Sequence, residues 1–117
     1  MYKELKIWQK SLDLVQEIYK LSEMLPKSEE YNLKSQLKRA VVSVSLNIAE
    51  GKCRSSAKDF AHFLNISSAS LTEVEVIIEI AKRLKYIKNC DAINVNIIKL
   101  NKMINSLRSK LINGKQN

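Results

Sequence analysis

The side chains that most often carry out chemistry in proteins are few in this sequence, and they stand in incomplete arrangements. Asp59 and His62 have the spacing of the carboxylate and histidine pairs that hold two iron ions inside some helical bundles. Such a site needs a second pair and two further carboxylates, whereas the chain has one histidine in all. Arg54 followed by His62 loosely matches the arginine and histidine pair of some helical RNases, but the interval is too long and crosses a predicted helix start. We therefore predict no metal site, no catalytic residue and no enzyme activity.

The cysteine and glycine patterns also argue against a bound cofactor. Cys53 and Cys90 lie far apart, with no CxxC pair and no partner histidines, so they indicate neither a zinc site nor a redox pair. If one long helix separates them, their thiols lie ~40 Å apart, whereas the Cα atoms of a disulfide lie ~6 Å apart. The sequence contains no phosphate-binding glycine loop and no dinucleotide motif. We expect two free thiols in a reducing compartment, and no cofactor.

A strong positive charge is the clearest functional signal. The chain has 20 lysines and arginines against 12 aspartates and glutamates, a net charge of +8. The surplus lies in residues 27–58 and 86–117, which favours a polyanionic partner such as RNA or DNA, because each neutralised phosphate releases counterions. The alternative is that the charge is compositional, since most of these residues are lysine and the chain is also rich in asparagine and isoleucine, as an AT-biased coding sequence would make it.

Candidate contacts to backbone phosphates cluster around the end of the second predicted helix and along the fourth, and no base readout is expected from them. These residues are Lys34, Lys38, Lys52, Arg54, Lys58, Lys99, Lys102, Arg108 and Lys110. Trp8 and Tyr19 could stack on bases, but they fall on a row predicted to face the core, so packing is the favoured interpretation.

The elements that must position these residues are helices. Hydrophobic residues make up 45% of the sequence, but two glycines and one proline are too few for the turns of an all-β fold. A chain of 117 residues has the length of one domain. We predict an all-α fold, a single antiparallel up-down-up-down four-helix bundle over residues 1–117, with helices at about 5–24, 29–50, 57–85 and 91–112. Residues 113–117 are expected to fray.

Nothing in the sequence predicts a membrane segment or a secretory signal. The longest uncharged stretch, residues 40–49, is too short to cross a hydrocarbon layer of about 30 Å. The first residues interleave charges with apolar side chains, where a signal peptide would have an unbroken apolar core. We expect a cytoplasmic protein.

The first predicted helix has more apolar surface than one core-facing stripe needs. A row predicted to face the core consists of Leu5, Trp8, Leu12, Val15, Ile18, Tyr19 and Ser22, and a second row consists of Ile7, Leu14 and Leu21. Together the rows cover about 200°, roughly twice the arc of a simple amphipathic helix, so we expect two buried faces. Ser28 is predicted to cap the second helix, either Ser55 or Ser56 to cap the third, and Gly51 to end the second in a left-handed conformation.

A line of polar residues runs along the second predicted helix between two apolar faces. Its members are Gln36, Arg39, Ser43, Asn47 and Glu50, preceded by Asn32. Their steps of three and four place them on one side of the helix. We predict that this polar seam packs against another helix or subunit, because its short members suit close approach; the alternative is an ordinary solvated face.

Several segments together are typical of one protein family. They are Trp8-Gln9-Lys10, Leu25-Pro26 with Glu29, Gln36 with Arg39-Ala40, the sequence NIAEG within residues 43–51, Arg54, and DFAHFL before the small residues at 67–70. Over about residues 5–86 the chain resembles the bacterial four-helix-bundle proteins known as 23S rRNA intervening sequence proteins. The resemblance implies assembly into a ring, typically a homopentamer. It also places the chain near accessory proteins of diversity-generating retroelements, which are similar basic pentameric barrels that engage nucleic acid and a reverse transcriptase.

Two functions are compatible with these observations. The first is a binding module, in which an oligomer presents several copies of a basic surface to RNA or DNA. The second is a structural adaptor, in which the ring organises a protein partner, such as a reverse transcriptase, and does not itself contact nucleic acid. The family name records where some of the genes lie and does not establish a role in the ribosome.

Overall fold

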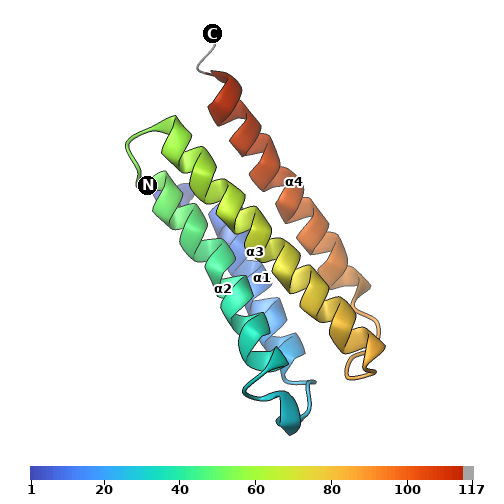
Figure 1. Cartoon of the computed structure of the whole chain (residues 1–117). Helices are drawn as coiled ribbons and strands as arrows, with labels where there is room; N and C mark the ends of the chain where they lie inside the picture. The colour runs from blue at the N-terminus through green and yellow to red at the C-terminus, as the bar shows by residue number, and fades with distance from the viewer. Residues whose placement is uncertain (115–117) are drawn as a thin grey trace.

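The computed structural model describes residues 1–114, and these form four long helices and no strand (Figure 1). The long helices are α1 (Lys6–Ser22), α2 (Leu33–Lys52), α3 (Ala57–Arg83) and α4 (Asp91–Asn113), with short 3-10 turns η1 (Tyr2–Glu4) and η2 (Lys27–Glu29). The predicted all-α class is confirmed. The fraying predicted to begin at residue 113 is wrong there, because α4 continues through Asn113; residues 115–117 of that segment lie outside the described part of the chain.

The helices lie side by side in an elongated body of 51 × 23 × 20 Å. The hydroxyls of Ser11 and Ser45 are 2.8 Å apart, and the Glu23 carboxylate lies 3.6 Å from the Lys34 ammonium, so the start of α1 lies beside the end of α2. In Figure 1 the N-terminus, the connection between α2 and α3, and the end of α4 all lie at one end of the body.

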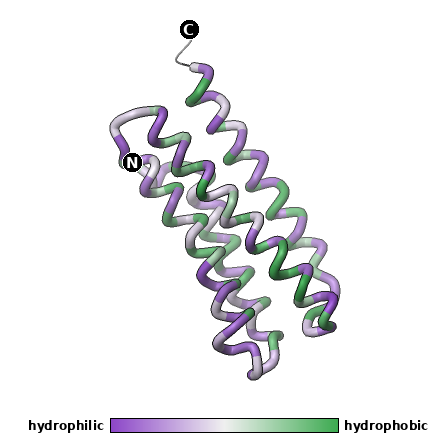
Figure 2. Tube along the Cα trace, in the orientation of Figure 1, coloured by the Kyte–Doolittle hydropathy of each residue, from purple (hydrophilic) through white to green (hydrophobic). Residues whose placement is uncertain are grey.

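The core is built from the apolar rows of all four helices. Hydrophobic residues recur along each helix among hydrophilic ones (Figure 2), which lets one face of each helix turn inward. The large side chains with no exposed surface include Ile18, Val41, Val44, Ile48, Leu64, Val74 and Ile104. Fully buried side chains therefore come from each of the four helices, whereas Leu46 of α2 and Leu84, directly after α3, remain 64% and 51% exposed.

The row of the first helix that was predicted to face the core does so only in part: Ile18 and Ser22 are fully buried, but other members are not. Ile7, Leu14 and Leu21 are buried, whereas Leu12 and Tyr19 of the row predicted to face the core are 37% and 40% exposed. The reason is tertiary: α1 contacts α2 and α4, and these two neighbours cover a narrower arc than both apolar rows occupy. Part of the apolar surface of α1 remains uncovered within one chain.

The predicted start of the second helix is also wrong. Residues 27–29 form η2 and α2 begins at Leu33, so Ser28 does not cap it. The carboxylate of Glu29 instead accepts a hydrogen bond of 3.3 Å from the Leu33 backbone amide and one of 3.1 Å from the Asn32 side chain. Glu29 thus satisfies a free amide at the start of α2, where the helix dipole favours a negative charge.

Both ends of α3 are capped by local hydrogen bonds. Of the two serines predicted to cap α3, Ser56 does so, with its hydroxyl accepting a hydrogen bond of 3.1 Å from the Asp59 amide. At the other end of α3, Lys85 adopts a positive φ of 65°, and the amide of Tyr86 donates to the Ala81 carbonyl at 2.9 Å. This is the C-terminal helix cap in which glycine usually occupies the position with positive φ.

Gly51 does not end α2 in a left-handed conformation, so that prediction is wrong. The glycine lies inside α2, has no positive φ, and is buried against α3. A Cβ atom at this position would lie 2.8 Å from the Cβ of Phe63 and 2.9 Å from the Cδ1 of Phe60. Gly51 is therefore needed for the close approach of α2 and α3 rather than for a special backbone angle.

Serine hydroxyls line the closest contacts between the helices. Ser11 meets Ser45 between α1 and α2, and the Ser67 hydroxyl donates to the Val44 carbonyl at 2.8 Å between α2 and α3. Small side chains allow the backbones to approach, and each buried hydroxyl has a hydrogen-bond partner, as burial of a polar group requires.

Candidate nucleic-acid interface

Positive charge gathers at one end of the bundle. Dividing each long helix at its midpoint places residues 1–13, 43–70 and 102–114 in the half that holds the N-terminus and the end of α4, which we call the basic end (Figure 1). It carries nine lysines and arginines and four acidic residues, whereas the other described residues carry ten and eight. The nine are Lys3, Lys6, Lys10, Lys52, Arg54, Lys58, Lys102, Arg108 and Lys110.

A groove between α3 and α4 brings predicted contact residues from separate parts of the chain together. Lys58 and His62 on α3 face Arg108 on α4 across a cavity of about 350 Å³. The cavity is also lined by Asn65, Ala61, Leu111 and Ile112. The groove therefore combines cationic and polar groups with an apolar surface.

Arg108 has an unusual environment within this groove. Its Nε atom is buried and has no hydrogen-bond partner, alone among the buried side-chain nitrogen and oxygen atoms of residues 1–114. A guanidinium carries five donors and cannot be deprotonated in proteins, so an unmade hydrogen bond here costs free energy. Arg108 therefore lines the groove with one buried donor that no group of the described chain satisfies.

A second groove, between α1 and α4, lies on the other side of α4. It has a volume of about 460 Å³, and three lysines line it: Lys6, Lys102 and Lys110. Lys102 and Lys110 were predicted from the sequence, and Lys6 was not. The sequence signal for Lys6 was weak because positive and negative charges balance over the first 26 residues.

Two further predicted contacts, Lys52 and Arg54, lie at the connection between α2 and α3. Lys52 is exposed and lines a groove with Lys3. The Arg54 guanidinium lies 4.7 Å from the centre of the Phe63 ring and 2.9 Å from the Glu50 carboxylate. Stacking on the ring fixes the plane of the guanidinium, while the exposed ion pair with Glu50 contributes little free energy.

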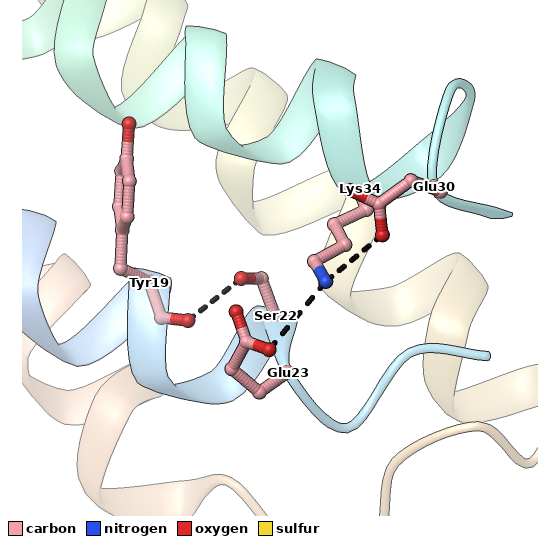
Figure 3. A network of polar contacts seen from close by, with 5 residues as sticks. All are labelled: Tyr19, Ser22, Glu23, Glu30 and Lys34. Carbon is pink, nitrogen blue, oxygen red and sulfur yellow. Dashed lines mark hydrogen bonds and ion pairs between the residues drawn. The ribbon is translucent and has the colours of Figure 1, made fainter. Parts of the chain in front are cut away.

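The remaining predicted contacts lie away from the basic end. Lys34 bridges Glu30 at 3.1 Å and Glu23 at 3.6 Å, and its side chain is only 12% exposed (Figure 3). The hydrogen bond to Glu30, together with the charge of Glu23, raises the pKa of Lys34 above its usual value. Lys38 lies 4.9 Å from the centre of the Tyr19 ring, and Lys99 is exposed on the first half of α4. The structure does not bring these three lysines together with the basic end.

The polar line on α2 divides into covered and exposed members. The Ser43 hydroxyl lies 2.8 Å from that of Ser70 on α3, and the Asn47 side chain donates to the Ser43 carbonyl at 2.8 Å. Gln36, Arg39 and Glu50 are exposed in a single chain. Only the middle of the line therefore packs against a helix of the same chain.

His62, the only histidine, is exposed and its ring contacts that of Phe63. Within residues 1–114, no three His, Cys, Asp or Glu side chains are grouped in a way that could hold a metal ion. Cys53 is exposed and Cys90 is buried, and both are free thiols. None of the helices in the described residues is long and apolar enough to span a membrane.

Comparison with known proteins identifies the family. The model of the 23S rRNA-intervening sequence proteins matches residues 3–106, which is most of the chain. The chain belongs to this family. The match includes the residues of both grooves up to Ser106 and the whole polar line, and it ends before Arg108 and Lys110.

A solved structure supports the same assignment. A crystal structure from Bacteroides thetaiotaomicron, described as a protein of unknown function from the S23 ribosomal protein family, is 28% identical in sequence and superposes with a TM-score of 0.80. The alignment covers 87% of this chain and 97% of that one, so the two folds agree over nearly their whole length. No curated protein sequence matches this chain.

Proposed function

We propose that this family member is a non-enzymatic binding module that holds RNA or DNA at the basic end through backbone phosphates. The supporting observation is that most of the cations there have no acidic partner within the chain. Of the nine lysines and arginines at the basic end, eight have no carboxylate within 4.0 Å among the described residues; Arg54 is the exception. Because these charges are not neutralised within the chain, they are available to displace counterions from a polyanion.

The arrangement around α4 suits a phosphate backbone better than a single small anion. Arg108 lines one groove and Lys102 and Lys110 the other, so cations lie on both sides of the second half of α4. Lys58 and Lys6 extend the charge onto α3 and α1. A strand lying along this end would meet several cations in succession, which is the arrangement of a sequence-independent contact.

We include self-assembly in this proposal, with up-down-up-down bundles forming a ring, typically a pentamer. Leu12, Tyr19 and Leu46 remain 37%, 40% and 64% exposed on adjoining parts of α1 and α2, and the exposed members of the polar line lie beside them on α2. Apolar surface flanked by hydrogen-bonding groups is typical of an interface between copies of a chain. A ring would repeat the basic end and multiply its avidity.

The alternative function is an adaptor that organises a protein partner, such as a reverse transcriptase. The exposed apolar surface of α1 and α2 favours it, because a partner protein could cover the same side chains. In that case the positive charge would be compositional, and the protein would show no affinity for nucleic acid even at low salt.

A salt titration separates the two functions. Binding to arbitrary RNA and DNA is measured by fluorescence anisotropy over a series of salt concentrations, with the wild-type chain and a Lys102→Ala, Lys110→Ala double variant. The proposal predicts a steep fall of affinity with log salt, and a slope about two units shallower per protomer in the variant if each lysine contacts one phosphate. Lys20→Ala, an exposed lysine of the opposite half, is the control and should leave the slope unchanged.

The same samples test for enzyme activity. We expect RNA to remain intact after prolonged incubation with the protein. Cleavage that disappears in His62→Ala would contradict the non-enzymatic assignment and give His62 a catalytic role.

A further inference from the structure

The groove between α3 and α4 has a composition that phosphate binding alone does not require. Lys58 and Arg108 suit a phosphate, but Ala61, Leu111 and Ile112 give the same cavity an apolar surface. A site for the phosphate backbone alone needs cations on an open surface and no apolar depression. A ligand that fills this groove therefore needs both a negative charge and a flat or apolar body.

The polar groups of the groove match the chemistry of a nucleobase. The Asn65 amide carries both a donor and an acceptor, the pair that recognises a base edge. His62 and the planar guanidinium of Arg108 are two of the surfaces on which unstacked bases rest in single-stranded complexes. The charges of Lys58 and Arg108 supply an independent indication, because neither side chain has a carboxylate within 4.0 Å among the described residues.

We propose that this groove takes up one unstacked base of a bound single strand, with the base held between the apolar surface and Arg108 and its phosphate beside Lys58. The cavity of about 350 Å³ falls in the range of sites that enclose small organic groups. This inference rests on the proposed function, which it deepens: the strand is held by phosphates over the whole basic end, and preference for single strands arises in this groove.

The test compares two ligands with equal numbers of phosphates. One is a fluorescein-labelled oligoadenylate of about ten nucleotides, and the other is an abasic strand of the same length. The wild-type protein should bind the oligoadenylate about tenfold more tightly, since stacking of one base contributes roughly 1–3 kcal/mol. Arg108→Lys retains the charge but loses the planar fork, so we expect the two affinities to become about equal while the salt dependence persists.

Matched variants separate base capture from phosphate contact. Asn65→Ala changes an exposed side chain and should reduce the preference for the oligoadenylate. Lys110→Ala should weaken binding of both strands by the same factor, because it lies in the other groove. Circular dichroism of each variant confirms that the helices are intact.

Four results would overturn the inference. If the wild-type protein binds both strands equally, with steep salt dependence, base capture is wrong and phosphate binding stands. The same conclusion follows if Arg108→Lys keeps the full preference. If neither strand binds at low salt, both this inference and the proposed function fail. Free adenosine monophosphate should bind far more weakly than the strand, because it lacks the neighbouring phosphate contacts; equal affinity would make the groove a site for free nucleotides instead.

Discussion

Replacing Gly51 by alanine is the most direct test of how α2 and α3 pack. The new Cβ would lie 2.8 Å from the Cβ of Phe63, 2.9 Å from the Cδ1 of Phe60 and 3.2 Å from the Phe60 carbonyl oxygen. Two of these atoms belong to the α3 backbone or are attached directly to it, so no side-chain rotation removes the overlap. Relief requires α2 and α3 to separate or slide.

Two opposing effects determine the size of the change. Alanine gains about 0.5–1 kcal/mol over glycine inside a right-handed helix, and Gly51 has no positive φ that would oppose the substitution. Carbon atoms pack best at about 3.5–4.0 Å, so the contact with Phe63 is short by roughly 1 Å, and overpacking of this kind costs about 1–3 kcal/mol. We expect a net loss of roughly 1–2 kcal/mol in the free energy of unfolding.

Urea unfolding followed by circular dichroism measures this loss, with every variant at one protein concentration because self-assembly would add to the stability. A fall in Tm of about 4 °C per kcal/mol should accompany it. Gly114→Ala is the control: a Cβ there meets no atom within 4 Å, so we expect no destabilisation. If Gly51→Ala stabilises the protein, as helix propensity alone would dictate, the proposed steric role of Gly51 is refuted.

Other predictions concern hydrogen bonds, pH and assembly. Ser11→Ala should lower the free energy of unfolding, measured in urea, by about 1 kcal/mol, because the Ser45 hydroxyl loses its buried partner. The double variant with Ser45→Ala should lose less than twice that amount. Lys34 has a raised pKa, so the stability it contributes is fully present below about pH 10.5 and is lost as the pH rises through its folded value; Lys34→Met should flatten the alkaline part of the stability curve, and an unchanged curve would contradict this. Glu50→Ala, at an exposed member of the polar line, should weaken assembly in sedimentation more than Lys20→Ala, and equal masses for both variants would count against a packed polar seam.

Local signals in the sequence predicted the helices and most of their inward faces. The apolar spacing along α2, α3 and α4 follows the turn of a helix, so the apolar residues form one face of each helix, and burying that face removes it from water. Ser56 before Asp59 predicted the start of α3, because the cap involves only neighbouring residues. The start of α2 was misplaced since the side chain that caps it, Glu29, reaches forward from a separate 3-10 turn.

The candidate site was only partly predictable. The sequence identified Lys58, Arg108 and Lys110 as basic residues in charge-rich segments, but not which of them would share a groove. It also grouped Lys34 with them, although two carboxylates from different elements neutralise it. Lys6 was overlooked because its neighbours in the sequence balance its charge, while its neighbours in space are lysines of α4.

The sequence by itself determined the all-α class, the approximate extent of four helices and the excess of positive charge, because these depend on composition and on spacing within one element. Tertiary structure decided which apolar row of α1 faces the core, why Gly51 must lack a side chain, and which lysines meet at the basic end. Each of these depends on how closely one helix approaches another and in which direction it runs, and such distances between elements leave no periodic trace in the chain.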